Sequence, residues 1–406
     1  MTRSIAVVGG GLVGLATAHA IARSDRDVRV TVFEKELGVA RHQSTHNSGV
    51  LHAGLYYVPG SLKARLAVSG IRMMVEFCRQ HQIAHEICGK IVVAVDESEI
   101  PRLRMLFDRG KANGLSGLRW LSPEEARAVE PNVRCVAAIH VPEEGIVDFA
   151  AVGEKLAGEV SRLGGNVLLG RHVSGLERRG AKWRISCVGG DVHECDQVIG
   201  CAGLYADRVA RMSNAPTEVR IVPFRGEYYR LRTDRGHLVR HLIYPVPDPS
   251  FPFLGVHFTR LIHGGIEAGP NAVLALSREG YRKAAINLRD VIDAITFPGF
   301  WRFLARHPLP VWDEVCRSMS RQLFCRALQR LVPELREDDL EVGGAGVRAQ
   351  AMTPAGNLVQ DFSLIEQPGL LHVLNAPSPA ATASLAIGAE IARRVVGLNV
   401  HSQVDT

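Results

Sequence analysis

The sequence predicts a two-domain protein of mixed α/β and α+β class, in which a discontinuous Rossmann-like nucleotide-binding domain carries an inserted, mainly antiparallel β-sheet domain. A glycine-rich β–α–β pattern stands at the start of the chain, and similar strand and helix patterns return in its middle and at its end. A long β pattern interrupted by prolines lies between them. We expect residues 1–80, 145–218 and 340–406 to form the nucleotide-binding domain, and residues 81–144 and 219–339 to form the inserted domain.

The first element is a β–α–β unit. Residues 4–8 (SIAVV) read as a short strand, and residues 15–23 (LATAHAIAR) have helical composition. Val28–Phe33 reads as a second strand. Between the first strand and the helix stands GGGLVG. A lone glycine motif is weak evidence, but a strand, these glycines, a helix, a second strand and a terminal acid together predict dinucleotide binding.

The glycines of this unit have separate tasks. We expect Gly9 to make the tight turn, Gly11 to let the backbone approach a pyrophosphate, and Gly14 to let the helix pack closely on the strand. The helix N-terminus offers free N–H groups to the phosphates. An acid after the second strand suits a ribose with free hydroxyls and argues against NADP. The residues expected to contact the dinucleotide here are Gly9, Gly11, Leu12, Val13, Gly14, Glu34 and Lys35.

The later elements follow from periodicity and composition. We expect helices at residues 62–81, 151–163 and 383–396, with a helical tendency over 290–331. Strands are expected at 166–169, 196–202 and 370–375, as a pair over 175–188, and through most of 219–269.

The choice between flavin and nicotinamide depends on the later segments. A nicotinamide enzyme would complete a contiguous six-stranded unit early in the chain, and the strand pattern after Phe33 does not continue that way. Residues 196–207 (DQVIGCAGLYAD) instead place a strand and a small-residue turn late, and residues 377–388 (PSPAATASLAIG) open a helix. That helix end would stabilise a reduced flavin, unless the helix serves only for packing. Further contacts are expected from Val173, Ala202, Gly203, Pro379, Ala380, Ala381 and Thr382.

Composition excludes several classes of protein. The chain has 406 residues, 46% of them hydrophobic, and a formal charge of +6 that is scattered rather than clustered, which suits a small anionic ligand and not nucleic acid. Eight cysteines without a CxxC pair read as reduced thiols, and the cysteine and histidine spacing predicts no metal site. Without a secretory pattern or an apolar run of about 20 residues, we expect a cytoplasmic protein, dissolved or peripheral on the inner face of the cell membrane.

Seven blocks spread along the sequence match one known family: VVGGGLVGLATA, HNSGVLHAGLYYVPGSLKA, VPFRGEYYRL, HLIYPVPDPSFPFLGVHFTR, GPNAVLALSREGY, AGVRAQ and NAPSPAATASLAIG. On these blocks the chain resembles the L-2-hydroxyglutarate oxidase/dehydrogenase family across nearly its full length. The wider group of FAD enzymes includes D-amino-acid oxidase, glycine oxidase and glycerol-3-phosphate dehydrogenase. The resemblance implies bound FAD, oxidation of (S)-2-hydroxyglutarate to 2-oxoglutarate, and transfer of electrons to oxygen or a membrane quinone.

The resemblance also implies roles for single residues. The loop HNSGVLHAG would pass along the flavin, with Asn47, Ser48 and Gly49 against the cofactor and His52 facing the substrate as general base. Arg348 would bind the 1-carboxylate of the substrate, because its planar guanidinium matches a carboxylate. His52 could instead stabilise the alkoxide, or only hydrogen-bond the cofactor or the backbone, and a surface salt bridge is the other interpretation of Arg348.

The group that binds the distal carboxylate stays open among several residues. The candidates lie in the β pattern of the inserted domain, where the strand register is not fixed by sequence, and one or two of them should face the substrate: Arg225, Tyr244, His257, Arg260 and Asn271.

Two alternatives to the hydroxyglutarate enzyme remain. One is another flavin enzyme of the same group, acting on an amino acid or glycerol 3-phosphate. The other is a non-catalytic protein folded around FAD that serves in interactions. Residues 297–331 interleave aromatics with arginines and would suit a helix lying on an anionic membrane, although a helix that packs on the substrate domain has the same composition.

Overall fold

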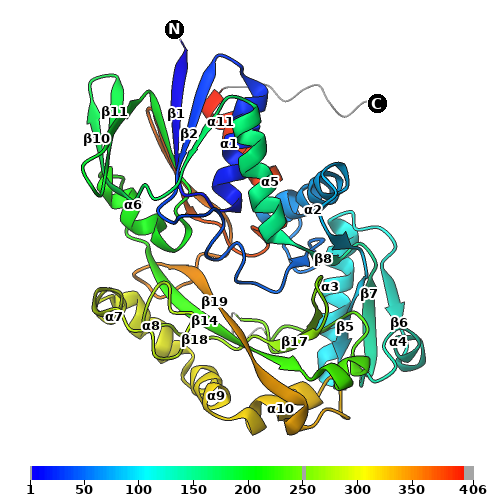
Figure 1. The fold of residues 1–406 in the computed structure, drawn as a ribbon. Helices are drawn as coiled ribbons and strands as arrows, with labels where there is room; N and C mark the ends of the chain where they lie inside the picture. The colour runs from blue at the N-terminus through cyan, green and yellow to red at the C-terminus, as the bar shows by residue number, and fades with distance from the viewer. Residues whose placement is uncertain (1, 249–252, 397–406) are drawn as a thin grey trace.

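Two large β-sheets organise the structure, a computed structural model that describes residues 2–248 and 253–396 (Figure 1). The first sheet has six strands in the order β20-β21-β13-β1-β2-β9. All neighbours are parallel except β20, which runs antiparallel to β21. The strands are β1 (Arg3–Val8), β2 (Val28–Phe33), β9 (Asn166–Leu168), β13 (Gln197–Gly200), β20 (Ser363–Gln367) and β21 (Leu370–Asn375). The sheet therefore collects strands from the beginning, middle and end of the chain, as the sequence predicts.

Both faces of this sheet are covered, which explains the near-continuous apolar sequence of β1. Ile5 and Val7 pack against the helices of one face, and the alternate residues Ala6 and Val8 face the other side. The helices are α1 (Leu12–Ser24), α5 (Phe149–Arg162) and α11 (Ser384–Val396). The other face carries β10 (Val173–Arg179), β11 (Lys182–Cys187), β12 (Val192–Cys195) and α6 (Ala206–Met212).

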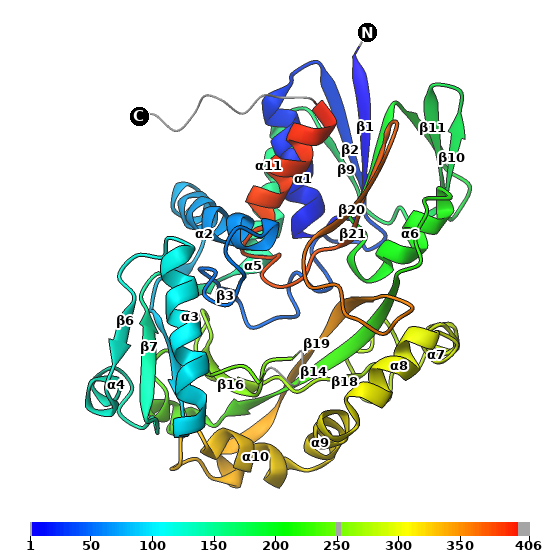
Figure 2. The ribbon, with the colours of Figure 1, turned by 180° about the vertical axis from the view of Figure 1, so that it is seen from behind.

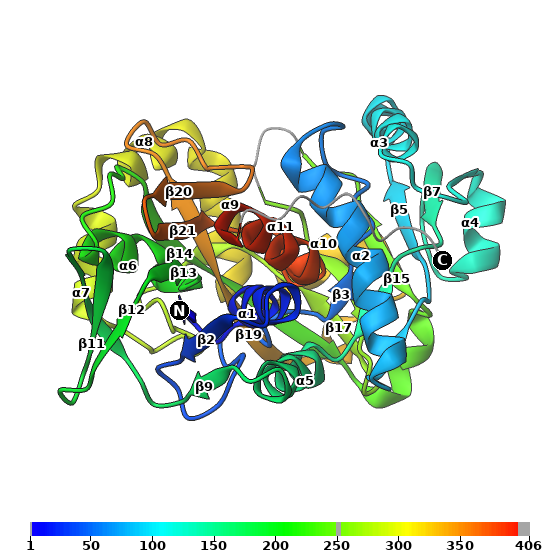
Figure 3. The same ribbon diagram turned by 90° about the horizontal axis from the view of Figure 1, so that it is seen from above.

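Helices α1 and α11 lie side by side although they stand at opposite ends of the chain (Figure 3). A Cβ atom placed on Gly388 of α11 would lie only 2.5 Å from the carbonyl carbon of Ala16 in α1. Because glycine has no Cβ, the two backbones approach closely. This contact fixes the last helix against the helix that follows the glycine turn.

The second sheet has nine strands and is mainly antiparallel, with β15 and β5 as a parallel pair. Its order is β18-β14-β17-β16-β15-β5-β7-β6, and β19 pairs with β14. The strands are β5 (Lys90–Ala94), β6 (Arg119–Leu121), β7 (Ala137–Val141), β14 (Arg220–Leu231), β15 (Leu242–Pro245), β16 (His257–Arg260), β17 (Ile266–Gly269), β18 (Val273–Leu274) and β19 (Leu340–Met352).

Strand β19 lies in a different sheet from the one expected for residues 340–406. It pairs with β14 from Leu340 to Met352 and so extends the inserted sheet past the expected boundary. Its sequence, LEVGGAGVRAQAM, is rich in glycine, which masks the strand pattern. A Cβ on Gly346 would lie 2.3 Å from the carbonyl oxygen of His46, so glycine is required where this strand crosses the loop of the other domain.

The remaining elements surround the second sheet. Helices α7 (Leu288–Ile295), α8 (Pro298–Arg306), α9 (Pro308–Met319) and α10 (Arg321–Gln329) follow one another along its outer side (Figure 2). On the other flank lie α2 (Leu62–Gln80), α3 (Ile100–Ala112) and α4 (Pro123–Val129). A small sheet in the order β3-β8-β4 lies between the domains and is formed by β3 (Val50–Leu51), β8 (Gly145–Val147) and β4 (His85–Glu86). Within the described residues, every helix is too short or too polar to cross a membrane.

Candidate functional site

A cavity of about 540 Å³ opens at the carboxyl ends of β1 and β2. This is where open α/β sheets bind their ligands. Basic side chains, among them Lys35, Arg41 and Arg208, line it. Seven residues predicted to bind the dinucleotide are in its wall: Gly9, Gly11, Glu34, Lys35, Val173, Ala202 and Gly203.

The glycines of the β1–α1 turn are required by close backbone contacts. Gly9 has φ +112°, and a Cβ on it would lie 2.4 Å from the carbonyl oxygen of Cys201. A Cβ on Gly14 would lie 2.0 Å from the carbonyl oxygen of Gly9. The turn and the close helix packing expected of these two glycines are therefore present in the geometry.

Glu34 ends β2 with a buried carboxylate. Its Oε2 accepts a hydrogen bond from the backbone N–H of Gly10 at 2.7 Å, and its Oε1 accepts one from the N–H of Glu36 at 2.9 Å. These bonds fix the carboxylate at the wall of the cavity, where it can accept hydrogen bonds from ribose hydroxyls.

The loop after β2 contributes residues that sequence reasoning missed. Arg41, His42, Gln43 and Ser44 all line the cavity. Ser44 accepts a hydrogen bond on Oγ from the N–H of Leu12, at the start of α1, at 3.0 Å. No spacing rule links this loop to the glycine turn, so the sequence offers no signal for it.

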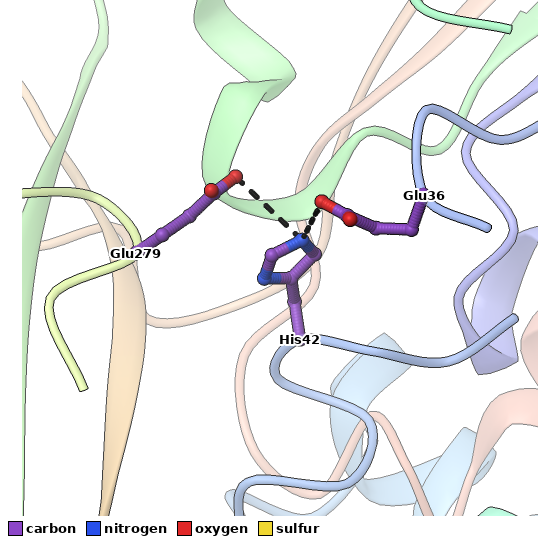
Figure 4. A group of neighbouring side chains, drawn as sticks. All are labelled: Glu36, His42 and Glu279. Atoms are coloured by element: carbon purple, nitrogen blue, oxygen red, sulfur yellow. Dashed lines mark hydrogen bonds and ion pairs between the residues drawn. The ribbon is translucent and has the colours of Figure 1, made fainter. Parts of the chain in front are cut away.

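Figure 4 shows how Glu36, His42 and Glu279 lie together, and of these His42 lines the cavity. The carboxylates lie 3.0 and 3.6 Å from Nε2 of His42, an arrangement that could suit a metal ion. The ammonium group of Lys35, however, contacts both carboxylates and lies 2.9 Å from the same nitrogen. Lys35 thus supplies the positive charge itself, and the cluster joins the loop after β2 to the inserted domain.

A second, smaller cavity of about 120 Å³ continues from the first and joins the two ends of the chain. The two cavities share Gly11, Gln43 and Ser44. On one side stand Leu12 and Val13, and on the other Ala380 and Ala381. The segment before the last helix thus lies beside the glycine turn, and its predicted contact with the cofactor stays a prediction.

The loop HNSGVLHAG connects this segment to the inserted domain. The hydroxyl of Thr382 donates to the carbonyl oxygen of Val50 at 3.1 Å, and its oxygen accepts from the N–H of His52 at 3.2 Å. The carbonyl oxygen of Pro379 accepts from the N–H of Ala383 at 2.9 Å and so begins the turn that leads into α11.

Asn47, Ser48 and Gly49 lie outside the lining of both cavities. The side-chain amide of Asn47 donates to the carbonyl oxygens of Gln43 and Ser44, both at 2.9 Å, and its oxygen accepts from the N–H of Gly49. The hydroxyl of Ser48 lies 3.5 Å from that of Tyr228. Here these residues shape the loop, and their predicted contact with the cofactor stays a prediction.

His52, Tyr244 and His257 gather on the side of the inserted sheet that faces the loop. Tyr244 stacks on His257 with ring centroids 3.9 Å apart, and His52 meets Tyr244 edge-on at 6.3 Å. Burial lowers the pKa of His257 to about 3, and the nearby charges of His52, Arg348 and Lys90 act in the same direction. His257 therefore stays uncharged at neutral pH.

Arg348 on β19 is half-buried beside this group. Its Nη1 donates to the carbonyl oxygen of Asn271 at 3.2 Å, and its guanidinium lies 5.7 Å from the ring centroid of Phe253. Single engagement by a carbonyl leaves most of its five N–H donors for a ligand. The geometry is compatible with the predicted carboxylate binder.

Arg225, Asn271 and Arg260 have other partners. Arg225 donates to Glu227 from Nε at 3.1 Å and from Nη2 at 2.8 Å. Asn271 exchanges hydrogen bonds with the backbone and carboxylate of the same Glu227, at 2.8 and 3.1 Å. Arg260 pairs with Glu86. The structure thus does not bring these three side chains to the His52 group, and only Tyr244 and His257 of the open set reach it.

Two charged residues beside His52 were missed by sequence reasoning. Lys90 on β5 and Glu144 in the turn before β8 are both fully buried, and their charged atoms lie 2.6 Å apart. Oε2 of Glu144 lies 3.4 Å from Nδ1 of His52. The two residues are 54 positions apart in the sequence, and the chain between them forms α3 and α4. No local sequence pattern could therefore reveal the pair.

The two cavities together fit an extended dinucleotide with a ring system at its far end. Glu34 stands where a ribose would lie, the glycine turn where a pyrophosphate would lie, and the segment before α11 where the redox ring would lie. A Cβ on Gly11 would lie 3.2 Å from Oγ of Ser44, so a side chain added at the centre of the trough would be tightly packed. The residues present fit FAD.

Comparison with known proteins identifies the family to which the chain belongs. The model of the FAD-dependent oxidoreductase family named DAO matches residues 4–394. L-2-hydroxyglutarate dehydrogenase of Indibacter alkaliphilus is 47% identical over 392 residues, covering 96% of this chain and 98% of the relative. The Escherichia coli K12 and human mitochondrial enzymes of the same name are each 42% identical, covering 96% of this chain and 92% and 88% of their own.

Solved structures agree on the fold. L-α-glycerophosphate oxidase of Mycoplasma pneumoniae, with FAD bound, superposes with a TM-score of 0.79 at 21% identity, covering 100% of this chain and 97% of that one. Glycine oxidase of Geobacillus kaustophilus gives 0.74 at 18% identity, covering 99% and 97%. The chain belongs to the DAO family of FAD-dependent oxidoreductases.

Proposed function

We propose that this protein oxidises L-2-hydroxyglutarate, the (S) enantiomer, to 2-oxoglutarate with FAD as its cofactor. The observation that carries the substrate assignment is the 47% identity to an L-2-hydroxyglutarate dehydrogenase over 96% of the chain. The site supports it, because His52 is bound through its backbone N–H to Thr382, the residue after Ala381 in the wall of the smaller cavity, and Arg348 directly precedes Ala349 in the same wall. Those are the two groups that oxidation of a 2-hydroxy acid needs.

His52 acts as the general base in this proposal. When bound, FAD supplies the acceptor for the hydride that leaves C2 of the substrate. The imidazole of His52 takes the proton from the hydroxyl group on C2 as the carbonyl forms. Its side chain is 20% exposed, so the ring reaches the site while most of it stays packed.

Arg348 and the Tyr244–His257 stack hold the two ends of the substrate. Arg348 binds the 1-carboxylate through its guanidinium N–H groups. The phenol of Tyr244, whose pKa burial raises far above the ordinary value, offers a neutral hydrogen bond to the distal carboxylate. The uncharged imidazole of His257 donates from Nδ1 to the carbonyl oxygen of Gly255 and stacks on that phenol, which holds the phenol in place. A substrate without that group would leave buried polar atoms unpaired, which favours a dicarboxylate over lactate.

Anaerobic reduction of the bound flavin tests this function. We expect L-2-hydroxyglutarate to bleach the flavin absorbance of the purified protein, and the D enantiomer, glycine and glycerol 3-phosphate to leave it unchanged. Bleaching by glycine or glycerol 3-phosphate instead would assign another substrate of the same enzyme group. A flavin that none of these compounds reduces would indicate a non-catalytic FAD protein.

For the electron acceptor we propose a membrane quinone, reached through peripheral contact with the membrane surface. Helices α7 and α9 each turn a row of apolar side chains to solvent at helical spacing. Leu288 and Ile292 of α7 are 74% and 54% exposed, and Leu309 and Trp312 of α9 are 75% and 62% exposed. Trp301 of α8 is 57% exposed between them. Exposed tryptophan and leucine beside arginine are typical of interfacial helices.

Vesicle sedimentation tests the membrane contact. We expect the wild-type protein to sediment with vesicles that contain anionic lipid, and the variant Trp301→Ser/Trp312→Ser to remain in the supernatant, with flavin reduction by substrate unchanged. Rapid reoxidation of the reduced protein by oxygen, together with no vesicle binding, would identify an oxidase and contradict the quinone proposal.

A further inference from the structure

Three charged side chains from distant parts of the chain form a row that ends at His52. Lys90 comes from β5, Glu144 from the turn between β7 and β8, and His52 from the segment after β3. The pairing of β3 with β8 sets Val50 opposite Ile146 and Leu51 opposite Gly145, so the residues that continue each strand, His52 and Glu144, meet.

The contacts of this row give each ring nitrogen of His52 a different environment. Nδ1 is buried and lies 3.4 Å from Oε2 of Glu144, an ion-pair contact whose geometry falls short of a hydrogen bond. The exposed fifth of the His52 side chain therefore belongs to atoms other than Nδ1. The second carboxylate oxygen of Glu144 accepts a hydrogen bond from the N–H of Ala53 at 3.2 Å, and this bond fixes the carboxylate next to the imidazole.

Lys90 keeps the buried carboxylate ionised. Burial alone raises the pKa of Glu144, but the charge of Lys90 and the contact with His52 outweigh burial and lower that pKa to about 2. The ammonium group of Lys90 is fully buried and lies 4.6 Å from the ring centroid of Tyr56 and 4.8 Å from that of Tyr244. Two aromatic faces and one carboxylate thus hold a cation that has no access to solvent.

We propose that the buried Lys90–Glu144 ion pair positions His52 for proton abstraction, a role that rests on the function proposed above. Ionised Glu144 holds the proton of His52 on Nδ1, which leaves the lone pair of Nε2 toward the substrate. The hydroxyl proton of the substrate moves to Nε2, the C2–O bond becomes a carbonyl, and the hydride leaves C2. Glu144 then stabilises the imidazolium. Lys90 and Glu144 act through His52 and are positioning residues.

The pair explains why two charges are buried in a place where apolar residues would pack as well. Replacement of a buried ion pair by hydrophobic residues is often neutral for stability, so such a pair is weak evidence of a structural role alone. The other titratable groups around His52 are Tyr56, Tyr244 and His257, and burial moves the pKa of each away from neutrality. In this group, only Glu144 therefore offers His52 a negative charge at neutral pH.

The pH profile of anaerobic flavin reduction tests the proposal. For Glu144→Gln we expect the rate at saturating L-2-hydroxyglutarate to fall at least about tenfold, the range of general-base catalysis, and the acidic limb of the profile to move to lower pH. The matched control is Glu143→Gln, one position earlier and bound to the N–H of Ser116 at the surface, which should keep the wild-type profile. Combining Glu144→Gln with His52→Ala should slow reduction no further than His52→Ala alone.

If Glu144→Gln does not fold, the double variant Lys90→Met/Glu144→Gln removes both charges. It should show the same slower flavin reduction and the same shift of the acidic limb of the pH profile to lower pH. An unchanged limb in a folded, FAD-loaded variant would overturn the proposal, since a merely structural role changes the amount of active protein and not its pH profile.

A measurement on histidine itself separates this inference from the proposed function. In protein labelled with carbon-13 at histidine Cε1, the His52 signal is the one that His52→Ala removes. Its pH midpoint should fall in Glu144→Gln, and an equal midpoint in both proteins would overturn the pairing whatever the substrate is. Failure of wild-type protein to be reduced by L-2-hydroxyglutarate would refute the proposed function and leave this result standing.

Discussion

Arg348 and Arg225 are two arginines of paired strands with contrasting surroundings. Arg348 gives one hydrogen bond to a backbone carbonyl, whereas Arg225 is bound through two nitrogens to Glu227. An arginine that already has a carboxylate partner has little left for a ligand, and one that has only a carbonyl partner retains its fork of donors. The two residues therefore form a natural comparison for substrate binding.

For Arg348→Lys we expect the KM for L-2-hydroxyglutarate to rise at least about tenfold, because lysine offers a point charge in place of a planar fork. The dissociation constant of FAD should stay the same. Arg225→Lys is the control and should leave the KM near its wild-type value. Steady-state kinetics with an artificial electron acceptor measure both variants, and an equal KM in Arg348→Lys and wild type would remove Arg348 from the substrate site.

His372 connects the charge of a single residue to the stability of the fold. It is 1% exposed on β21, its Nε2 lies 2.8 Å from the hydroxyl of Ser213, and burial lowers its pKa to about 4. The folded-state pKa thus lies below the value near 6.5 expected of an unfolded chain. Between these two values the unfolded state binds more protons, so stability falls as the pH drops through that window.

We expect the free energy of unfolding to decrease between pH 6.5 and pH 4, by up to about 1.4 kcal/mol per pH unit for this one histidine. His372→Gln should make the pH dependence shallower, and His237→Gln, on an exposed histidine, should not. Urea unfolding followed by tryptophan fluorescence at several pH values measures the slope. Parallel slopes for wild type and His372→Gln would contradict the assignment.

The site residues that sequence could predict are those held by short-range geometry. The tasks of Gly9 and Gly14 follow from the strand–turn–helix pattern, and the structure gives them contacts of 2.4 and 2.0 Å that exclude a side chain. Lys90 and Glu144 escaped prediction because their pairing depends on how β5, β7 and β8 come together. Sequence shows which residues are charged, but not which distant charges meet inside the protein.

At the scale of elements, the helix α1 depends on a glycine where it leaves β1. Gly14→Ala would place a methyl group 2.0 Å from a backbone oxygen that has no freedom to move. We expect the variant to bind FAD at least about tenfold more weakly, because the displaced helix start no longer presents its N–H groups to the pyrophosphate.

Gly158→Ala in α5 is the matched control, since its Cβ would meet nothing within 4 Å. That substitution should leave FAD binding unchanged and raise helix stability by roughly 0.5–1 kcal/mol. Flavin content after purification and titration of the apoprotein with FAD give both results. A fully loaded Gly14→Ala protein would contradict the steric argument.

Elements with strong periodicity were predicted well, and β19 was not. The helix expected at residues 62–81 is α2 (Leu62–Gln80), and the strand expected at 370–375 is β21 (Leu370–Asn375). In β19 the three glycines Gly343, Gly344 and Gly346 remove the side chains on which a strand pattern depends. At Gly343 and Gly346 the backbone of another segment lies too close for a side chain. That requirement depends on the tertiary structure and is not visible in the sequence.

At the scale of the whole molecule, a buried ion pair joins the two domains. Arg278 of the inserted domain binds Asp207 of α6 through two nitrogens, at 2.5 and 2.9 Å, and the side chains are 1% and 0% exposed. Arg278 also donates to the carbonyl oxygen of Leu204, a residue in the wall of the first cavity. The connection between domains thus passes beside the dinucleotide site.

For Arg278→Met we expect a loss of about 3–5 kcal/mol of stability, because the buried charge of Asp207 loses its buried partner and keeps only the more exposed Arg211, 3.5 Å away. Arg179→Met is the control, since its pair with Glu177 is more than half exposed and worth at most about 1 kcal/mol. Thermal unfolding of the FAD-loaded proteins compares them. Equal melting temperatures for Arg278→Met and wild type would show that the domains are held together elsewhere.

The six-stranded sheet takes its strands from residue 3 to residue 375 of the chain. In synthesis from the N-terminus at about 5–20 residues per second, β21 leaves the ribosome roughly 20–75 s after β1. During that interval the nascent polypeptide exposes the edge of β13 (Gln197–Gly200) that β21 covers in the complete sheet. FAD therefore binds only after nearly the whole chain has been synthesised. Until then, chaperones have a long interval in which to protect the incomplete sheet.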